Sequence, residues 1–159
     1  MMKFGPVFKQ DRALLSLGKE MEVTKILIAE DNPDILTIMA DRLKSEGYDV
    51  ITATDGEMAW DQITRLDPDI ILLDLMMPKM DGYEVLKKLR DNPPREKWQP
   101  VIIISAKGEL QDLKKGYELE ADHYITKPWR MEDILQGIRK MLALNRQRKA
   151  VPQKAQETS

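Results

Sequence analysis

Short apolar runs alternate with segments of helical periodicity along most of the chain. The apolar runs predict five strands, at residues 25–29, 49–53, 70–73, 101–104 and 123–126. The third and fourth runs are apolar at every position, which is typical of central strands that helices cover on both faces. Strands that alternate with helices predict an α/β fold, a doubly wound parallel sheet built from five βα units.

The helical segments carry their own start and stop signals. Asn32 is placed to cap the first helix, with Pro33 at its first position and Gly47 at its end. Asp55 opens a second helix. The prolines between residues 91 and 100 forbid a continued helix there. Three further helices are expected, at about 82–90, at about 110–119 and from about residue 131.

The repeating pattern occupies residues 23–145, which we interpret as one domain. A chain of 159 residues is long enough for one substantial core, and we expect no attached effector domain. Residues 1–22 show no clear period and are interpreted as a flexible arm. Residues 146–159 are polar and basic, and we interpret them as a tail that follows a fraying helix.

Polar side chains follow four of the predicted strands, at the point where each strand ends. Glu30 and Asp31 follow the first strand, Asp74 the third, Ser105 the fourth and Lys127 the fifth. The carboxyl ends of parallel strands line one crevice, so these side chains should lie together. Three carboxylates in one cleft repel one another unless a cation is bound, and oxygen ligands of this kind suit Mg²⁺. The sequence therefore predicts a magnesium site.

Four motifs in this order resemble a known family. They are Glu30-Asp31, Asp74 with the trailing Met-Met-Pro-Lys-Met-Asp-Gly, Ser105-Ala106 and Lys127-Pro128. Together they resemble the receiver domain of response regulators in two-component signalling, over about residues 24 to 145. The resemblance implies the flavodoxin-like (βα)5 receiver fold, and a single-domain regulator similar to those of chemotaxis. Such a domain catalyses only its own phosphorylation and dephosphorylation.

The resemblance also implies the chemistry of the acidic site. Asp74 would be the phosphoacceptor, taking the phosphoryl group from a sensor histidine kinase or a histidine phosphotransfer protein of a phosphorelay. Mg²⁺ would be bound directly by Asp74, by Asp31 and by the backbone carbonyl of Met76, and through water by Glu30. Glu30 stands where this family often has Asp, and its extra methylene leaves the water-mediated role intact.

A switch is the second implication of the resemblance. Lys127 would pair first with Asp74 and later with a phosphoryl oxygen, and the bond from Lys127 to Pro128 would be cis. Ser105 would hydrogen-bond the phosphoryl group while Tyr124 rotates inward. This would remodel the face formed by the helix at 110–119, the strand at 123–126 and the last helix. We expect that face to bind a downstream protein or a second copy of the chain.

Composition narrows the partners and the compartment. The net charge of -2, from 25 basic and 27 acidic residues, carries no general signal for nucleic acid or membrane, so neither is an expected partner. The chain has no cysteine, which excludes a disulfide framework and thiol chemistry. The first twenty residues lack the apolar core of a signal peptide, and no later run reaches membrane-spanning length. The cytoplasm is the expected compartment.

Three other functions fit parts of the pattern. A phosphatase or mutase with an aspartyl nucleophile also places Asp after an apolar strand, but it generally needs a second acid where Met76 stands. A flavodoxin-like module for a phosphorylated cofactor would need backbone donors after the first strand, where Glu30 and Asp31 would repel phosphate. A receiver fold without phosphorylation would be a scaffold, although every expected polar group is present. Taken alone, Tyr124 could be a packing residue. The kinase, the downstream partner and the phosphoryl lifetime stay open.

Overall fold

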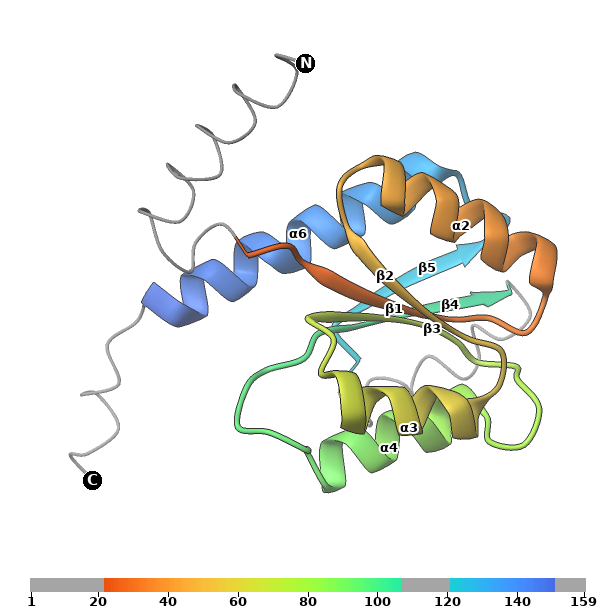
Figure 1. Ribbon diagram of the computed structural model, residues 1–159, viewed down its shortest axis with the longest axis horizontal. Helices are drawn as coiled ribbons and strands as arrows, with labels where there is room; N and C mark the ends of the chain where they lie inside the picture. The colour runs from red at the N-terminus through yellow and green to blue at the C-terminus, as the bar shows by residue number, and fades with distance from the viewer. Residues whose placement is uncertain (1–21, 107–120, 151–159) are drawn as a thin grey trace, which may run out of the picture.

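Five parallel strands form one sheet in the computed structural model, which describes residues 22–106 and 121–150 (Figure 1). The strand order is β2-β1-β3-β4-β5, and every neighbouring pair is parallel. The chain order changes direction between β1 and β3, the point of a doubly wound sheet where ligands bind. The predicted fold class is confirmed. The strands are β1 Lys25–Ala29, β2 Asp49–Ala53, β3 Ile70–Asp74, β4 Val101–Ala106 and β5 His123–Lys127.

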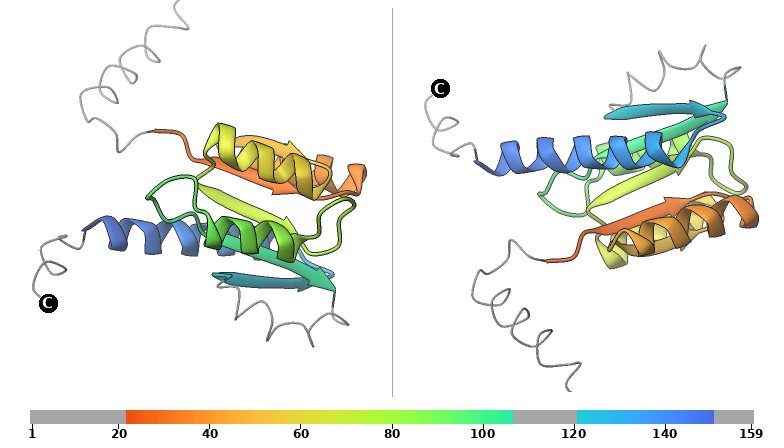
Figure 2. Two further views of the ribbon diagram at one scale, coloured as in Figure 1. Left: turned by 90° about the horizontal axis from the view of Figure 1, so that it is seen from below. Right: turned by 90° about the horizontal axis from the view of Figure 1, so that it is seen from above.

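Helices cover both faces of the sheet. Ile26 and Ile28 of β1 pack into a cluster on one face of the sheet, whereas Leu27 and Ala29 pack into a cluster on the other face. All five residues of β3 are buried, including Asp74 at its end. An otherwise apolar strand therefore ends in one carboxylate, at the end of the sheet where the strands have their carboxyl termini. One face carries α2 Pro33–Ser45 and α6 Met131–Ala150, and the other α3 Gly56–Leu66 and α4 Gly82–Asp91 (Figure 2).

Polar caps start three of the helices at the edge where the strands end. Asn32 Oδ1 accepts from the backbone N–H groups of Asp34 and Ile35 at the start of α2. Asp55 caps α3 by accepting from Met58 N–H at 2.7 Å. Asp81 caps α4 through Glu84 N–H. Each cap satisfies backbone donors that a helix leaves unpaired, and the three caps lie in the loops that follow β1, β2 and β3.

The last helix, α6, ends at Ala150, within the basic segment in which the sequence predicted a fraying helix end and a tail. The Arg148 guanidinium carbon lies 3.8 Å from the centroid of the Trp98 ring, a cation–π contact that holds the final turns against the body of the domain. Among residues 22–106 and 121–150, no helix is both long and apolar enough to cross a membrane. The helix predicted at 110–119 lies outside the described residues, as do 1–21 and 151–159.

A hydrogen-bond network lies at the end of the sheet opposite the site, where β4 and β5 begin. Asp122 accepts from Arg90 Nη2 at 2.7 Å, from Trp98 Nε1 at 3.1 Å and from Val101 N–H at 2.8 Å. These donors come from α4, from the loop that follows it and from the start of β4. One carboxylate therefore joins three segments, and its side chain is only 16% exposed.

Asp122→Ala should lower the free energy of unfolding by about 3 kcal/mol, because three partly buried donors lose this acceptor. Urea unfolding followed by tryptophan fluorescence measures the change. Asp91→Ala is the matched control, since the ion pair of Asp91 with Lys87 is exposed and should contribute about 0.5 kcal/mol at most. Equal losses in the two variants would contradict the assigned role of Asp122.

Candidate functional site

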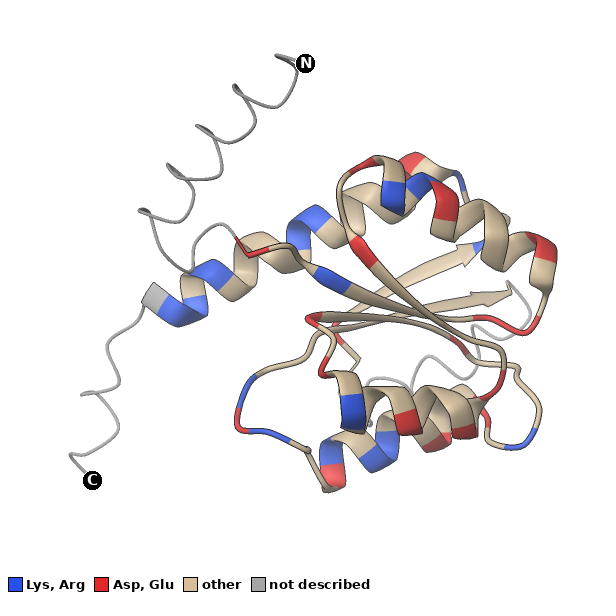
Figure 3. Cartoon of the chain, in the orientation of Figure 1, with Lys and Arg blue, Asp and Glu red and all other residues tan. Residues whose placement is uncertain are grey.

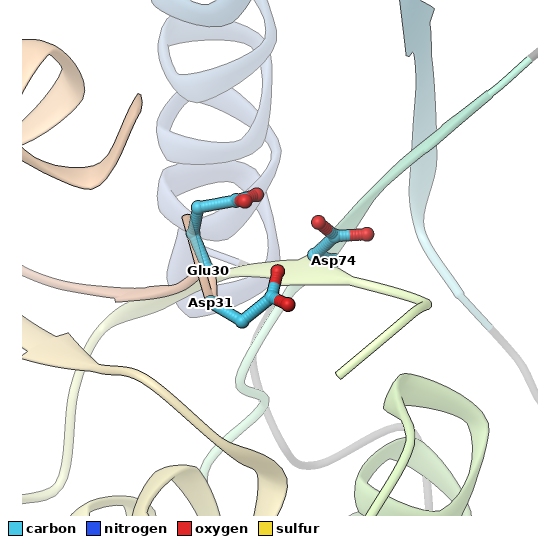
Figure 4. A group of neighbouring side chains, drawn as sticks. All are labelled: Glu30, Asp31 and Asp74. Carbon is cyan, nitrogen blue, oxygen red and sulfur yellow. The ribbon is translucent and has the colours of Figure 1, made fainter. Parts of the chain in front are cut away.

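The predicted carboxylates lie together at the end of the sheet where the strands have their carboxyl termini. Asp74 ends β3, and Glu30 and Asp31 directly follow β1, its neighbour in the sheet. One carboxylate oxygen from each of the three lies within 4.8 Å of the others. Figure 4 shows the three side chains turned toward a shared space. Glu30 and Asp74 are buried and Asp31 is exposed, so the cluster opens to solvent on the Asp31 side.

Lys127 reaches this cluster from the end of β5, the strand at one edge of the sheet. Its Nζ lies 2.8 Å from Asp74 Oδ2 and 3.9 Å from Glu30 Oε2. The other oxygen of Asp74, Oδ1, accepts from Met76 N–H at 3.2 Å. Asp74 is only 2% exposed, so a buried carboxylate is held by one ammonium group and one backbone donor. The bond from Lys127 to Pro128 is cis.

Glu30 has the most perturbed acid group of the site. Burial first, and then the neighbouring Asp74, raise the pKa of Glu30 from 4.5 to about 8. The N–H of Asn32, which donates to Glu30 Oε1 at 3.1 Å, and the charge of Lys127 act in the opposite direction. The ammonium of Lys127 and the N–H groups of Asn32 and Met76 thus compensate part of the negative charge of the three acids. This excess of negative oxygen fits a hard divalent cation such as Mg²⁺.

Residues 75–81 form the loop that borders the acidic cluster. Gly82 N–H donates to Leu75 O at 2.9 Å, and Met80 N–H donates to Pro78 O at 2.8 Å. Met76 lies two residues after Asp74, and its side chain is 65% exposed. Its N–H is used by Asp74, while the role of its carbonyl as a metal ligand stays a prediction.

The two predicted switch residues, Ser105 and Tyr124, lie on β4 and β5. Ser105 is buried and pairs in register with Thr126, the neighbour of Lys127. Tyr124 packs against the core cluster under α3 and α4, and its hydroxyl oxygen is buried. Both residues therefore lie on strands that end at the site, as predicted. Their movement on phosphorylation stays a prediction.

The sequence did not indicate that three residues near the site, Asp55, Gly56 and Lys79, contribute to it. Gly56 at the start of α3 is in close backbone contact with Met80, and Asp55 forms an ion pair with Lys79 of the 75–81 loop. The Asp-Gly dipeptide at 55–56 was available as a turn signal. Its contact with a loop more than twenty residues away is a tertiary feature that no local pattern contains.

Comparison with known proteins decides the family. A family model described as "Response regulator receiver domain" matches residues 26–139, most of the 159-residue chain. The chain belongs to the response regulator receiver family. Receiver domains of this family are signalling domains rather than metabolic enzymes.

Curated relatives and a solved structure agree with the receiver assignment. The receiver is 39% identical over 134 residues to the DNA-binding dual master transcriptional regulator RpaA of Synechocystis, covering 84% of the chain and 54% of RpaA. It is 41% identical over 118 residues to the alkaline phosphatase synthesis transcriptional regulatory protein PhoP of Bacillus subtilis, covering 74% of the chain and 48% of PhoP. The chain spans about half the length of these relatives.

Among solved structures, the receiver matches the CheY-like response regulator receiver domain protein of Methanospirillum hungatei. The TM-score is 0.74 and the sequence identity 27%, over 80% of this chain and 99% of that chain. The flavodoxin-like receiver fold predicted from the motif order is thereby confirmed.

One sequence expectation is wrong. Nucleic acid was not an expected partner, yet the relatives are transcriptional regulators and RpaA is named as DNA-binding. The net charge of -2 is an average that hides an uneven distribution: after Asp133, α6 carries only basic charges (Figure 3). Overall charge also describes only the chain that is counted, and this receiver spans about half of those regulators.

The stability of the metal-free receiver should fall as pH rises from about 4.5 to about 8. The raised pKa of Glu30 means that the folded state binds this proton more tightly than the unfolded state. Its contribution is thus fully present below 4.5 and lost as pH rises through about 8. Glu30→Gln keeps the acceptor for Asn32 N–H and removes the titration, so at pH 8 in EDTA it should be more stable than the parent by roughly 2 kcal/mol after allowance for solvent screening.

Thermal and urea unfolding across this pH range measure the difference. Glu57→Gln, on the exposed first turn of α3, is the control and should keep the pH slope of the parent. An unchanged slope in Glu30→Gln would show that Glu30 does not carry the effect.

Proposed function

We propose that this receiver is the phosphoacceptor of a two-component or phosphorelay pathway and that Asp74 receives the phosphoryl group. The observation that carries the proposal is the burial of Asp74 at a strand end, 2.8 Å from Lys127 Nζ and beside Glu30 and Asp31. A buried carboxylate with a lysine and two further acids costs stability, and a reaction at that carboxylate explains why the fold retains it.

The reaction is phosphoryl transfer from a phosphohistidine of a kinase or phosphotransfer protein. A carboxylate oxygen of Asp74 attacks the phosphorus, an O–P bond forms, the N–P bond breaks and the histidine imidazole leaves. Mg²⁺ held by Asp31, Asp74 and the Met76 carbonyl, with Glu30 acting through water, would supply positive charge to the phosphoryl oxygens. The domain itself catalyses this step and the later hydrolysis.

Lys127 links the reaction to the rest of the domain. Its ammonium is bound to Asp74 Oδ2, and conversion of the Asp74 carboxylate to an acyl phosphate would remove the carboxylate charge that holds it there. The ammonium would then move to a phosphoryl oxygen. Ser105 would hydrogen-bond the same group and Tyr124 would stabilise the resulting conformer, so that phosphorylation shifts a population rather than building a new fold.

We propose that the output of this receiver reaches DNA. The support is its similarity to RpaA and PhoP, whose names describe transcriptional regulators. The second candidate output is a protein contact of the receiver itself, by similarity to the CheY-like receiver domain protein. A homodimer through the face that includes residues 110–119 stays a prediction, since those residues lie outside the described part of the chain. A location in the cytoplasm also stays a prediction.

Asp74→Asn should abolish phosphorylation, because an amide cannot form the acyl phosphate. The measurement is the intact mass after incubation with Mg²⁺ and acetyl phosphate, where the parent alone should gain one phosphoryl group. Asp81→Asn is the control from the same motif, and it should be modified like the parent because Asn caps a helix as well as Asp does. Equal modification of Asp74→Asn and the parent would sink the site assignment.

Lys127→Ala should separate phosphorylation from its consequence. The variant should accept phosphate at about a tenth of the parent rate or less, since it loses one charge that stabilises the transferred group. Beryllofluoride with Mg²⁺ should then change the tryptophan fluorescence of the parent and leave that of the variant unchanged. Lys140→Ala, a change on the exposed side of α6, is the control. A full fluorescence response in Lys127→Ala would contradict the coupling role.

A further inference from the structure

The start of α3 lies against the loop that borders the acidic cluster. Gly56 is buried, and a Cβ added to it would overlap the Met80 carbonyl oxygen and lie 2.6 Å from Met80 Cβ. Gly56 N–H also faces Pro78 O at 3.4 Å. The obstacle is backbone, which cannot move aside as a flexible side chain can. Only glycine therefore permits this approach of α3 to the 75–81 loop.

An ion pair joins the same two segments. Lys79 Nζ lies 3.6 Å from Asp55 Oδ2, while Asp55 Oδ1 caps α3 through Met58 N–H. The Met58 N–H first, and Lys79 in addition, lower the pKa of Asp55. Lys79 has φ 68°, a left-handed conformation that a non-glycine residue adopts only where its surroundings impose it. One carboxylate thus anchors both the helix start and the turn of the loop.

The other end of the loop is fixed by α4. A Cβ added to Gly82 would overlap the Asp74 carbonyl oxygen and lie 2.8 Å from Leu75 Cα. Residues 75–81 are therefore held between two glycine contacts, one from α4 beside Asp74 and one from α3 beside Met80. A Cβ added to Gly137 in α6, by contrast, would lie closest to side chains, at 3.1 Å from His123 Cδ2 and 3.4 Å from Ile102 Cδ1.

We propose that Asp55 and Gly56 are positioning residues for the metal site, and that the start of α3 sets the Mg²⁺ affinity by fixing the shape of the 75–81 loop. This inference rests on the proposed function. Neither residue belongs to the acidic cluster. They act through the loop that carries Met76, and any force that displaces the start of α3 changes metal binding at Asp74.

The test measures the Mg²⁺ dissociation constant by isothermal titration calorimetry. Gly56→Ala should weaken Mg²⁺ binding about tenfold or more, as loss of support around a metal site does. Gly137→Ala is the matched control and should stay within about twofold of the parent, because its added methyl group meets side chains that can shift. Unfolding in EDTA shows whether each variant is folded. At saturating Mg²⁺ the rate of phosphorylation by acetyl phosphate should recover in Gly56→Ala.

The ion pair gives a second, milder set of variants. Asp55→Asn keeps the helix cap and removes the charge, and Lys79→Gln removes the partner charge. Each should weaken Mg²⁺ binding by about two- to fivefold, and the double variant should add little to either, as expected for two residues of one interaction. Lys87→Gln is the control: Lys87 is 63% exposed against 60% for Lys79, and it also has an ion-pair partner.

Two failures are distinguishable. Parent protein that binds no Mg²⁺, or that binds it as Asp31→Ala does, overturns the proposed function itself. A parent that binds Mg²⁺ more tightly than Asp31→Ala, together with unchanged affinity in Gly56→Ala, Asp55→Asn and Lys79→Gln, overturns only the positioning role. If Gly56→Ala does not fold, the charge variants decide: parent-like affinity in both of them rejects the inference.

Discussion

Repulsion among three carboxylates is the constraint around which this site is organised. Glu30, Asp31 and Asp74 share one end of the sheet within 4.8 Å, and the ammonium of Lys127 lies 2.8 Å from Asp74 and 3.9 Å from Glu30. The hydrogen bonds from Asn32 and Met76 compensate part of the remaining charge. Burial first, and then the neighbouring Asp74, raise the pKa of Glu30 to about 8, so a charged carboxylate is unfavourable at this position. A bound divalent cation would relieve both effects.

The sheet prevents the acids from separating. β1 and β3 are paired from Ile26↔Ile70 to Ala29↔Leu73, and Glu30 N–H continues toward β2 by donating to Ala53 O. Both faces of these strands are buried under helices. Moving Asp74 away from Glu30 would break ladder hydrogen bonds and open the core, which costs more than the repulsion does. Protonation of Glu30 or binding of a cation is the remaining way to relieve it.

The sequence predicted the features that depend on a single strand or helix. The apolar runs indicated the five strands, and the polar residues after four of these runs indicated the acids, Ser105 and Lys127. Features that depend on distant partners were beyond reach. α6 extends to Ala150 with Arg148 stacked on Trp98, and Gly56 is required by the backbone of Met80. The DNA-related output of the relatives was missed because net charge averages over position.

The strands and the 75–81 loop hold their parts of the site with different firmness. The part that is held less firmly is the one that can be adjusted. The carboxylates are attached to ladder strands inside the core, so their positions are fixed by the fold as a whole. The 75–81 loop is fixed by backbone contacts from Gly56 and Gly82 and by Lys79, whose side chain is 60% exposed. Contacts at the surface can be altered by a protein that binds there without unfolding the domain. Changes in metal affinity should therefore arise on the loop side, whereas the strand side supplies the constant negative charge.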